Sequence, residues 1–228
     1  MTELSWGWGT ALASAHLCLC VVVALYARRE RSHIPFLVFL VSFFIADRLR
    51  SLTGVHLDRA HAPYVGFDRV LLHTDRFLYL ASRFGFAWVC GHIFQSRVTK
   101  WLAASGFAVT YLFLLVTYPP VDATLQGYVF QGAEVFWLMI AWFSALRAAL
   151  GGAHVKPNFL HLVLLVLLGS DSVAVLVGYL DNAVVGIAGS DPVWAAIMAT
   201  TFVAYVVCIS VYASRLFAPE PRTAEVLQ

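Results

Sequence analysis

Charged residues are scarce in this chain. Lys, Arg, Asp and Glu make up 12% of its 228 residues, and 61% of the residues are hydrophobic. A soluble globular domain carries about 25% charged residues, so the composition excludes an ordinary soluble enzyme or regulator. It predicts an integral membrane protein whose first partner is the lipid bilayer. The net charge of +2 says little about other partners, and we expect no nucleic-acid partner.

Sequence patterns of catalysis and metal binding are also missing. The four cysteines, Cys18, Cys20, Cys90 and Cys208, lie in apolar stretches and form no CxxC pair. No HExxH, GxSxG or phosphate-binding glycine loop occurs. The sequence therefore leaves enzyme activity open, since no catalytic pattern supports it, and predicts no metal site and no cofactor on the basis of a motif.

Lysine is almost absent. The chain has two lysines, Lys100 and Lys156, against thirteen arginines, and it is rich in Ala, Val and Leu. This bias is typical of a GC-rich bacterial gene and predicts a multi-pass protein of the bacterial cytoplasmic (inner) membrane. Both lysines lie outside the long apolar runs, so a retinal-binding lysine in the last run is excluded.

Long apolar runs fill most of the chain. A transmembrane helix needs about 20 predominantly apolar residues, and seven runs approach that length. We therefore predict an all-α polytopic membrane protein, with a seven-helix bundle over residues 1–217 and a short polar tail over 218–228. The predicted spans are 5–27, 34–53, 69–96, 101–119, 126–149, 157–180 and 193–217.

The positive charges predict the orientation of these spans. Cytoplasmic loops carry an excess of Lys and Arg, and nine of the fifteen Lys and Arg flank one side of the predicted bundle. This places the N-terminus outside and the C-terminus in the cytoplasm. The nine residues are Arg28, Arg29, Arg31, Arg97, Lys100, Arg147, Lys156, Arg215 and Arg222. The other six are Arg48, Arg50, Arg59, Arg69, Arg76 and Arg83.

Three of these six arginines recur at seven-residue intervals in the third predicted span. Seven residues are close to two helical turns, so Arg69, Arg76 and Arg83 share a face that drifts only about 20° per step. Tyr79 lies on the same stripe. Neighbouring helix residues do not face each other, so we expect Asp47-Arg48 and Asp75-Arg76 to pair with other helices or loops rather than internally.

Acidic residues interrupt other spans at a similar depth. Asp47, Glu134 and Asp171 all fall between the outer third and the midplane, as does Arg83. A charge in the bilayer core is costly and usually functional, so these groups predict a shared polar cavity that opens to the outside. The predicted ligand-binding residues are Asp47, Asp75, Arg76, Tyr79, Arg83, Glu134 and Asp171.

We interpret this set as the site of a protein that binds, translocates or senses a small polar or ionic ligand. A purely structural role is the competing interpretation, because an ion pair of Arg83 with Glu134 or Asp171 can lock a bundle. A second alternative is a redox subunit with haem b between His92 and His161, which share a depth, exchanging electrons with quinone. A third is a non-catalytic membrane subunit whose charged face contacts a partner membrane protein.

Overall fold

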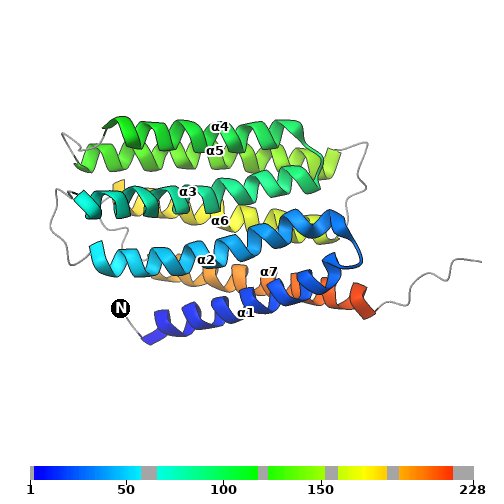
Figure 1. Ribbon diagram of the computed structural model, residues 1–228. Coiled ribbons are helices and arrows are strands. Elements are labelled where there is room, and N and C mark those ends of the chain that lie inside the picture. The colour runs from blue at the N-terminus through cyan, green and yellow to red at the C-terminus, as the bar shows by residue number, and fades with distance from the viewer. Residues whose placement is uncertain (1–2, 58–65, 118–122, 152–158, 184–189, 218–228) are drawn as a thin grey trace, which may run out of the picture.

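The computed structural model describes residues 3–57, 66–117, 123–151, 159–183 and 190–217, and it is all-helical over these residues. The predicted tail, 218–228, lies outside them. Seven α-helices and one short 3-10 helix form the described fold (Figure 1). They are α1 (Glu3–Ala27), η1 (Arg31–His33), α2 (Ile34–Leu57), α3 (Gly66–Ile93), α4 (Arg97–Thr117), α5 (Ala123–Gly151), α6 (Phe159–Ala183) and α7 (Ser190–Phe217).

Five of the α-helices are long and apolar enough to cross a membrane, namely α1, α4, α5, α6 and α7. α2 and α3 are as long, but each carries several charged residues. Those of α2 are Asp47, Arg48 and Arg50. Those of α3 are Asp68, Arg69, Asp75, Arg76 and Arg83. The hydropathy of the helices therefore supports a membrane protein with five clear candidate spans.

The junction between α3 and α4 lies earlier than predicted. The sequence placed the end of the third span at residue 96, but α3 ends at Ile93 because Gln95 adopts a left-handed conformation with φ 55°. The N–H of Ser96 donates to the carbonyl of Gly91 at 2.8 Å, which is the hydrogen bond of a Schellman C-cap. The Ser96 hydroxyl then accepts the N–H of Thr99 at 3.1 Å and so caps the start of α4.

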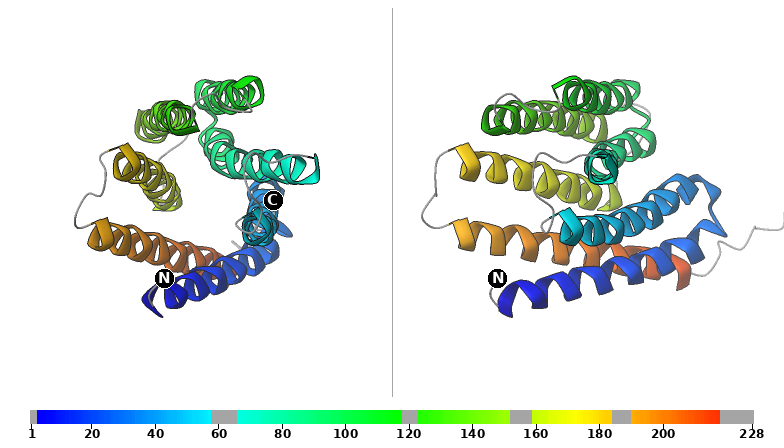
Figure 2. Two further views of the ribbon diagram at one scale, coloured as in Figure 1. Left: turned by 90° about the vertical axis from the view of Figure 1, so that its left-hand side faces the viewer. Right: turned by 60° about the vertical axis from the view of Figure 1, so that its left-hand side comes forward.

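The helices form two groups that share α3 and α6. In the first, α1, α2, α3, α6 and α7 make a closed ring in which each helix contacts the next. Figure 2 shows this ring end-on, with α4 and α5 on one side of it. In the second group, α4 and α5 contact each other, and they pack against α3 and α6. Across the ring, α2 meets α7 at one end, where the rings of Phe36 and Tyr212 stack with their centroids 6.3 Å apart.

The second group is tightly packed. Phe84 of α3, Leu138 of α5 and other buried residues form a common apolar cluster there. Gly106 of α4 allows this approach, because a Cβ at that position would lie 2.6 Å from the Phe84 ring and 2.8 Å from the Trp137 Cβ. A larger apolar core contains residues from all seven α-helices, and Tyr212 is its largest fully buried side chain.

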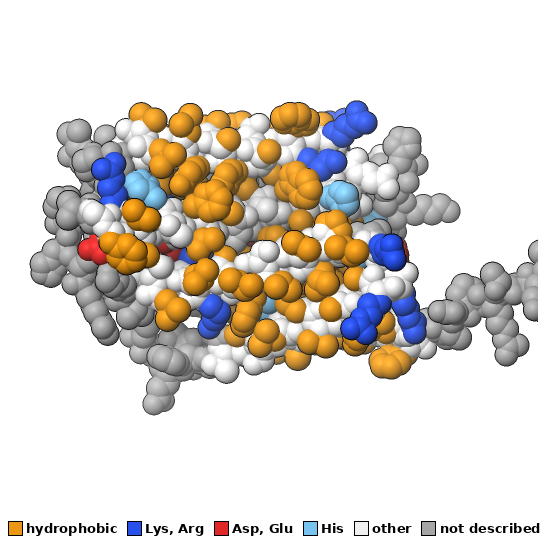
Figure 3. All heavy atoms as spheres, viewed as in Figure 1, with side chains coloured by type: hydrophobic (Ala, Val, Ile, Leu, Met, Phe, Trp, Pro, Cys, Tyr) orange, Lys and Arg blue, Asp and Glu red, His pale blue; other side chains and the backbone are white. Residues whose placement is uncertain are grey.

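The outer surface of the bundle is apolar between its two ends. Figure 3 shows hydrophobic side chains over the middle of the visible face, with Lys and Arg mainly toward the ends. Large side chains are well exposed there, including Phe136 at 58% and Phe143 at 55%. Exposed apolar area on this scale is unusual for a soluble monomer and suits contact with lipid.

Candidate functional site

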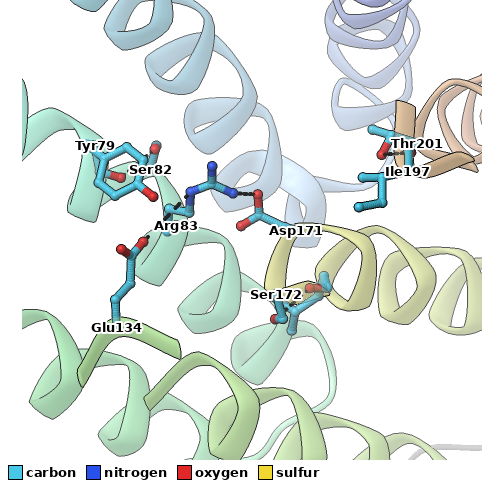
Figure 4. A network of polar contacts seen from close by, with 9 residues as sticks. Tyr79, Ser82, Arg83, Glu134, Asp171, Ser172, Ile197 and Thr201 are labelled. Carbon is cyan, nitrogen blue, oxygen red and sulfur yellow. Dashed lines mark hydrogen bonds and ion pairs between the residues drawn. The ribbon is translucent and has the colours of Figure 1, made fainter. Parts of the chain in front are cut away.

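Arg83 lies at the boundary between the two helix groups. Its guanidinium donates from Nη1 to Oδ1 of Asp171 on α6, and its Nε lies 4.0 Å from Oε1 of Glu134 on α5. Figure 4 shows the two acids on different sides of the arginine. The sequence left open which acid pairs with Arg83. Asp171 forms the hydrogen bond, while Glu134 is at the outer limit of an ion pair.

The two acids have different surroundings. The Asp171 side chain is 26% exposed, whereas Glu134 is fully buried, and neither of its carboxylate oxygens accepts a hydrogen bond from the described residues. A guanidinium has five N–H donors, and Arg83 uses one of them in a hydrogen bond within the described part of the chain. Arg83 thus has spare donors, and Glu134 has spare acceptors.

A second ion pair lies beside the first. Arg50 of α2 donates from Nε to Oδ1 of Asp75 on α3 at 3.1 Å, and the Thr53 hydroxyl also lies within 3.4 Å of that oxygen. The Tyr79 ring lies between two cations, with the guanidinium carbon of Arg50 4.5 Å and that of Arg83 5.0 Å from the ring centroid. These cation–π contacts connect α2 and α3 at the level of Arg83.

The ion pair between Asp47 and Arg48 contradicts one prediction from the sequence. They were expected to pair with other helices, but Nη2 of Arg48 lies 2.5 Å from Oδ2 of Asp47, so the two form an ion pair with each other. The Arg48 side chain is long enough to fold back along the helix, and both side chains are about half exposed. Asp75, in contrast, pairs across helices with Arg50 as expected.

The ring of helices encloses a cavity of about 700 Å³. Aromatic and aliphatic side chains line most of it, including Phe36, Leu40 and Phe43. The charged residues in its wall are Asp47, Arg48, Arg83 and Asp171. A pocket of this size with a few polar groups in an apolar wall is typical of small-molecule sites.

The remaining predicted site residues lie outside this wall. Asp75, Arg76, Tyr79 and Glu134 are not among the residues that line the cavity. Glu134 approaches Arg83 from α5. The guanidinium carbon of Arg76 lies 5.9 Å from the centroid of the Phe130 ring, also on α5. The arginine stripe therefore contributes one residue, Arg83, to the cavity.

Two cavity residues that contact each other, His16 and Tyr205, were not in the predicted site. His16 of α1 is buried, and its Nε2 lies 2.8 Å from the Leu40 carbonyl oxygen. Because a carbonyl only accepts, Nε2 donates, and Nδ1 of the neutral ring then accepts the Tyr205 hydroxyl at 3.2 Å. His16 thereby connects α1, α2 and α7. The signal in the sequence was a histidine in the middle of an apolar run, which by itself does not identify its partners.

The two histidines proposed for haem lie in different surroundings. His92 is exposed and stacks on Trp88 of its own helix with ring centroids 5.9 Å apart. His161 is buried and meets the edge of Phe94 with centroids 5.1 Å apart. Among the described residues no group of three or more His, Cys, Asp and Glu could hold a metal ion. The haem hypothesis stays a prediction.

Comparison with known proteins adds no assignment to this geometry. No protein-family model matches the chain, and no curated protein or solved structure matches it either. The class of protein therefore follows from the fold itself, a helical bundle with several helices suited to a membrane. The site must be interpreted from its own chemistry.

Proposed function

We propose that this protein spans the bacterial cytoplasmic membrane with seven helices and binds a small polar or ionic ligand in an intramembrane site that opens to the outside, in order to translocate or sense it. The observation that carries the proposal is the cavity of about 700 Å³ with Asp47, Arg83 and Asp171 in its wall. If the ion pairs served only to fix the packing of the helices, a cavity next to them would not be expected.

The geometry of α2 and α3 supports the full number of spans. At 1.5 Å per residue, the 24 residues of α2 and the 28 residues of α3 extend about 36 Å and 42 Å, and a hydrocarbon core is about 30 Å thick. Both helices run alongside α1 and α4 in the bundle (Figure 1). Five of their eight charged side chains make ion pairs within or between helices, namely Asp47, Arg48, Arg50, Asp75 and Arg83.

The distribution of basic residues supports the orientation. Arg29 near the end of α1 donates to the Leu216 carbonyl at the end of α7 at 2.7 Å, so these two basic helix ends are adjacent. Arg97 begins α4 at the point where α3 ends. An end of the bundle enriched in arginine is expected to face the cytoplasm.

Cysteine accessibility tests the site without knowledge of its ligand. In a variant that lacks the four native cysteines, we expect Ser170→Cys in the cavity wall to react with a membrane-impermeant cationic thiosulfonate added to intact cells. Val173→Cys, on the exposed face of the same helix and close to Ser170 in depth, is the matched control and should not react. Equal labelling of both positions, or labelling of Ser170→Cys only from the cytoplasmic side, would refute an outward-facing site.

A further inference from the structure

The cavity combines an apolar body with one charged region. Its lining follows α2 from Phe36 to Arg48, which is about 18 Å at the helical rise. This distance is more than half of a hydrocarbon core of about 30 Å. Phe36, Phe39 and Leu40 line the apolar part, while the two residues of the Asp47–Arg48 pair stand at the other end of this stretch.

The charges in the cavity wall balance. Arg48 forms an ion pair with Asp47, and Arg83 forms one with Asp171, so the wall holds two cations and two anions in adjacent pairs. Next to it, Arg50 and Asp75 are a further matched pair. An ion that enters such a site adds a net charge in a region of low dielectric constant, which is unfavourable unless a pair opens to receive it.

The pairs still have hydrogen-bonding capacity toward a ligand. Arg83 has donors that no described residue uses, and one oxygen of Asp171 accepts no hydrogen bond from the described part of the protein. The Thr201 hydroxyl donates to the carbonyl of Ile197 on its own helix, so its oxygen can only accept from a ligand. Donors and acceptors are thus available together, without an excess of charge of either sign.

We propose that the ligand is an amphipathic molecule with an apolar body and a head group of zero net charge, either an uncharged hydrogen-bonding group or a zwitterion. The head contacts Arg83 and Asp171, and the body extends along Phe39 and Leu40. This inference rests on the proposed function, because it names the ligand class for the same cavity. It narrows the ionic ligand suggested by the arginine stripe, of which only Arg83 reaches the cavity wall.

The test uses three radiolabelled probes with one chain and fixed head charges: dodecanol, dodecanesulfonate and dodecyltrimethylammonium. Binding is measured to the protein in lipid nanodiscs, with empty nanodiscs subtracted. We expect dodecanol to bind at least about tenfold more tightly than either ion, because an unbalanced charge at this depth costs more than that factor represents. Tightest binding of dodecanesulfonate or of dodecyltrimethylammonium, or equal binding of all three, overturns the inference.

Two neighbouring residues of α7 provide a matched pair of variants that tests whether the probes bind in the cavity. Ala195 lines the cavity, whereas Ala196 is exposed on the outside of the helix. Ala195→Phe should abolish dodecanol binding, and Ala196→Phe should preserve it. If Ala195→Phe leaves the binding of every probe unchanged, the cavity is not a binding site and the proposed function fails. If Ala195→Phe abolishes binding but a charged probe binds best, only the head-group inference fails.

Removing one charge from the cavity wall should shift the preference among the three probes toward the probe that replaces the lost charge. Asp171→Asn leaves Arg83 without its hydrogen-bonded acid and should shift the preference toward dodecanesulfonate by about tenfold or more. Arg48→Gln leaves Asp47 without its partner and should shift it toward dodecyltrimethylammonium, by less because this pair is half exposed. An unchanged preference in both variants contradicts the charge-balance argument, and the second variant keeps the test decisive if the first does not fold.

Discussion

Removal of one partner of the Arg83–Asp171 pair should destabilise the protein more than removal of both. The two side chains are 22% and 26% exposed, so each is about three-quarters buried. Breaking a buried pair by removing one charge costs about 3–5 kcal/mol, and replacing both charges by apolar residues is often close to neutral. Allowing for the partial exposure, we expect Arg83→Leu and Asp171→Leu each to cost about 2–3 kcal/mol.

The double variant gives the informative value. We expect Arg83→Leu combined with Asp171→Leu to cost no more than about 2 kcal/mol, which is less than the sum of the single costs by at least about 2 kcal/mol, the coupling energy of the pair. The assay is the free energy of unfolding in lipid bicelles by steric trapping, for the wild type, the two single variants and the double variant. Additivity of the single effects to within about 0.5 kcal/mol would show that the pair is not coupled and would refute this reasoning.

Glu134 serves as the internal control for that cycle. It lies 4.0 Å from the same guanidinium but accepts no hydrogen bond from the described residues. Glu134→Gln keeps the shape of the side chain and an oxygen toward Arg83. We therefore expect it to cost less than about 1 kcal/mol, clearly less than Asp171→Leu. A larger cost for Glu134→Gln than for Asp171→Leu would mean that Arg83 is held mainly by α5.

Two further predictions concern packing and pH. Gly106→Ala should lower the free energy of unfolding by about 1–3 kcal/mol, because the new Cβ would lie 2.6 Å from the Phe84 ring. In the matched control Gly178→Ala, the nearest neighbour of the new Cβ lies at 4.0 Å, and this substitution should cost nothing. Equal effects of the two variants in the same unfolding assay would contradict the packing argument. Burial lowers the pKa of His33 in η1, against the opposing influence of the Glu30 carboxylate. His33 therefore binds a proton more readily in the unfolded chain than in the folded protein. The stability that neutral His33 provides is complete above about pH 6.5 and is lost as the pH falls toward the folded-state pKa. In His33→Asn this loss should disappear from the pH profile of the free energy of unfolding, and an unchanged profile would exclude His33 as its source.

The helices could be predicted from the sequence because apolar runs of bilayer length leave the chain few alternatives. The runs and the helices begin and end within a few residues of each other. The early end of α3 arises because Gln95 adopts a left-handed conformation that is more typical of glycine or asparagine. Hydropathy alone does not detect a helix end of this kind, since Ile93 and Phe94 continue the apolar pattern.

The membership of the site could be predicted only in part. The sequence indicated the shared depth of Asp47, Arg83 and Asp171, and all three line one cavity. It did not indicate which helices are neighbours, so it could not separate Asp171, which bonds to Arg83, from Glu134, which only approaches it. The partners of a buried side chain depend on helix order and rotation, and both follow from packing between distant segments.

Arg83 and Phe84 are consecutive residues of α3, but they contact different parts of the protein. Arg83 contributes to the cavity wall, while the ring of Phe84 lies against Gly106, which also touches the Cβ of Trp137. A rotation or shift of α3 that accommodates a bound molecule must therefore press on the contact between Phe84, Gly106 and Trp137. Trp194 lines the cavity and Trp137 does not. In a variant whose other six tryptophans are replaced by phenylalanine, the fluorescence of Trp137 is therefore expected to report a bound molecule without touching it.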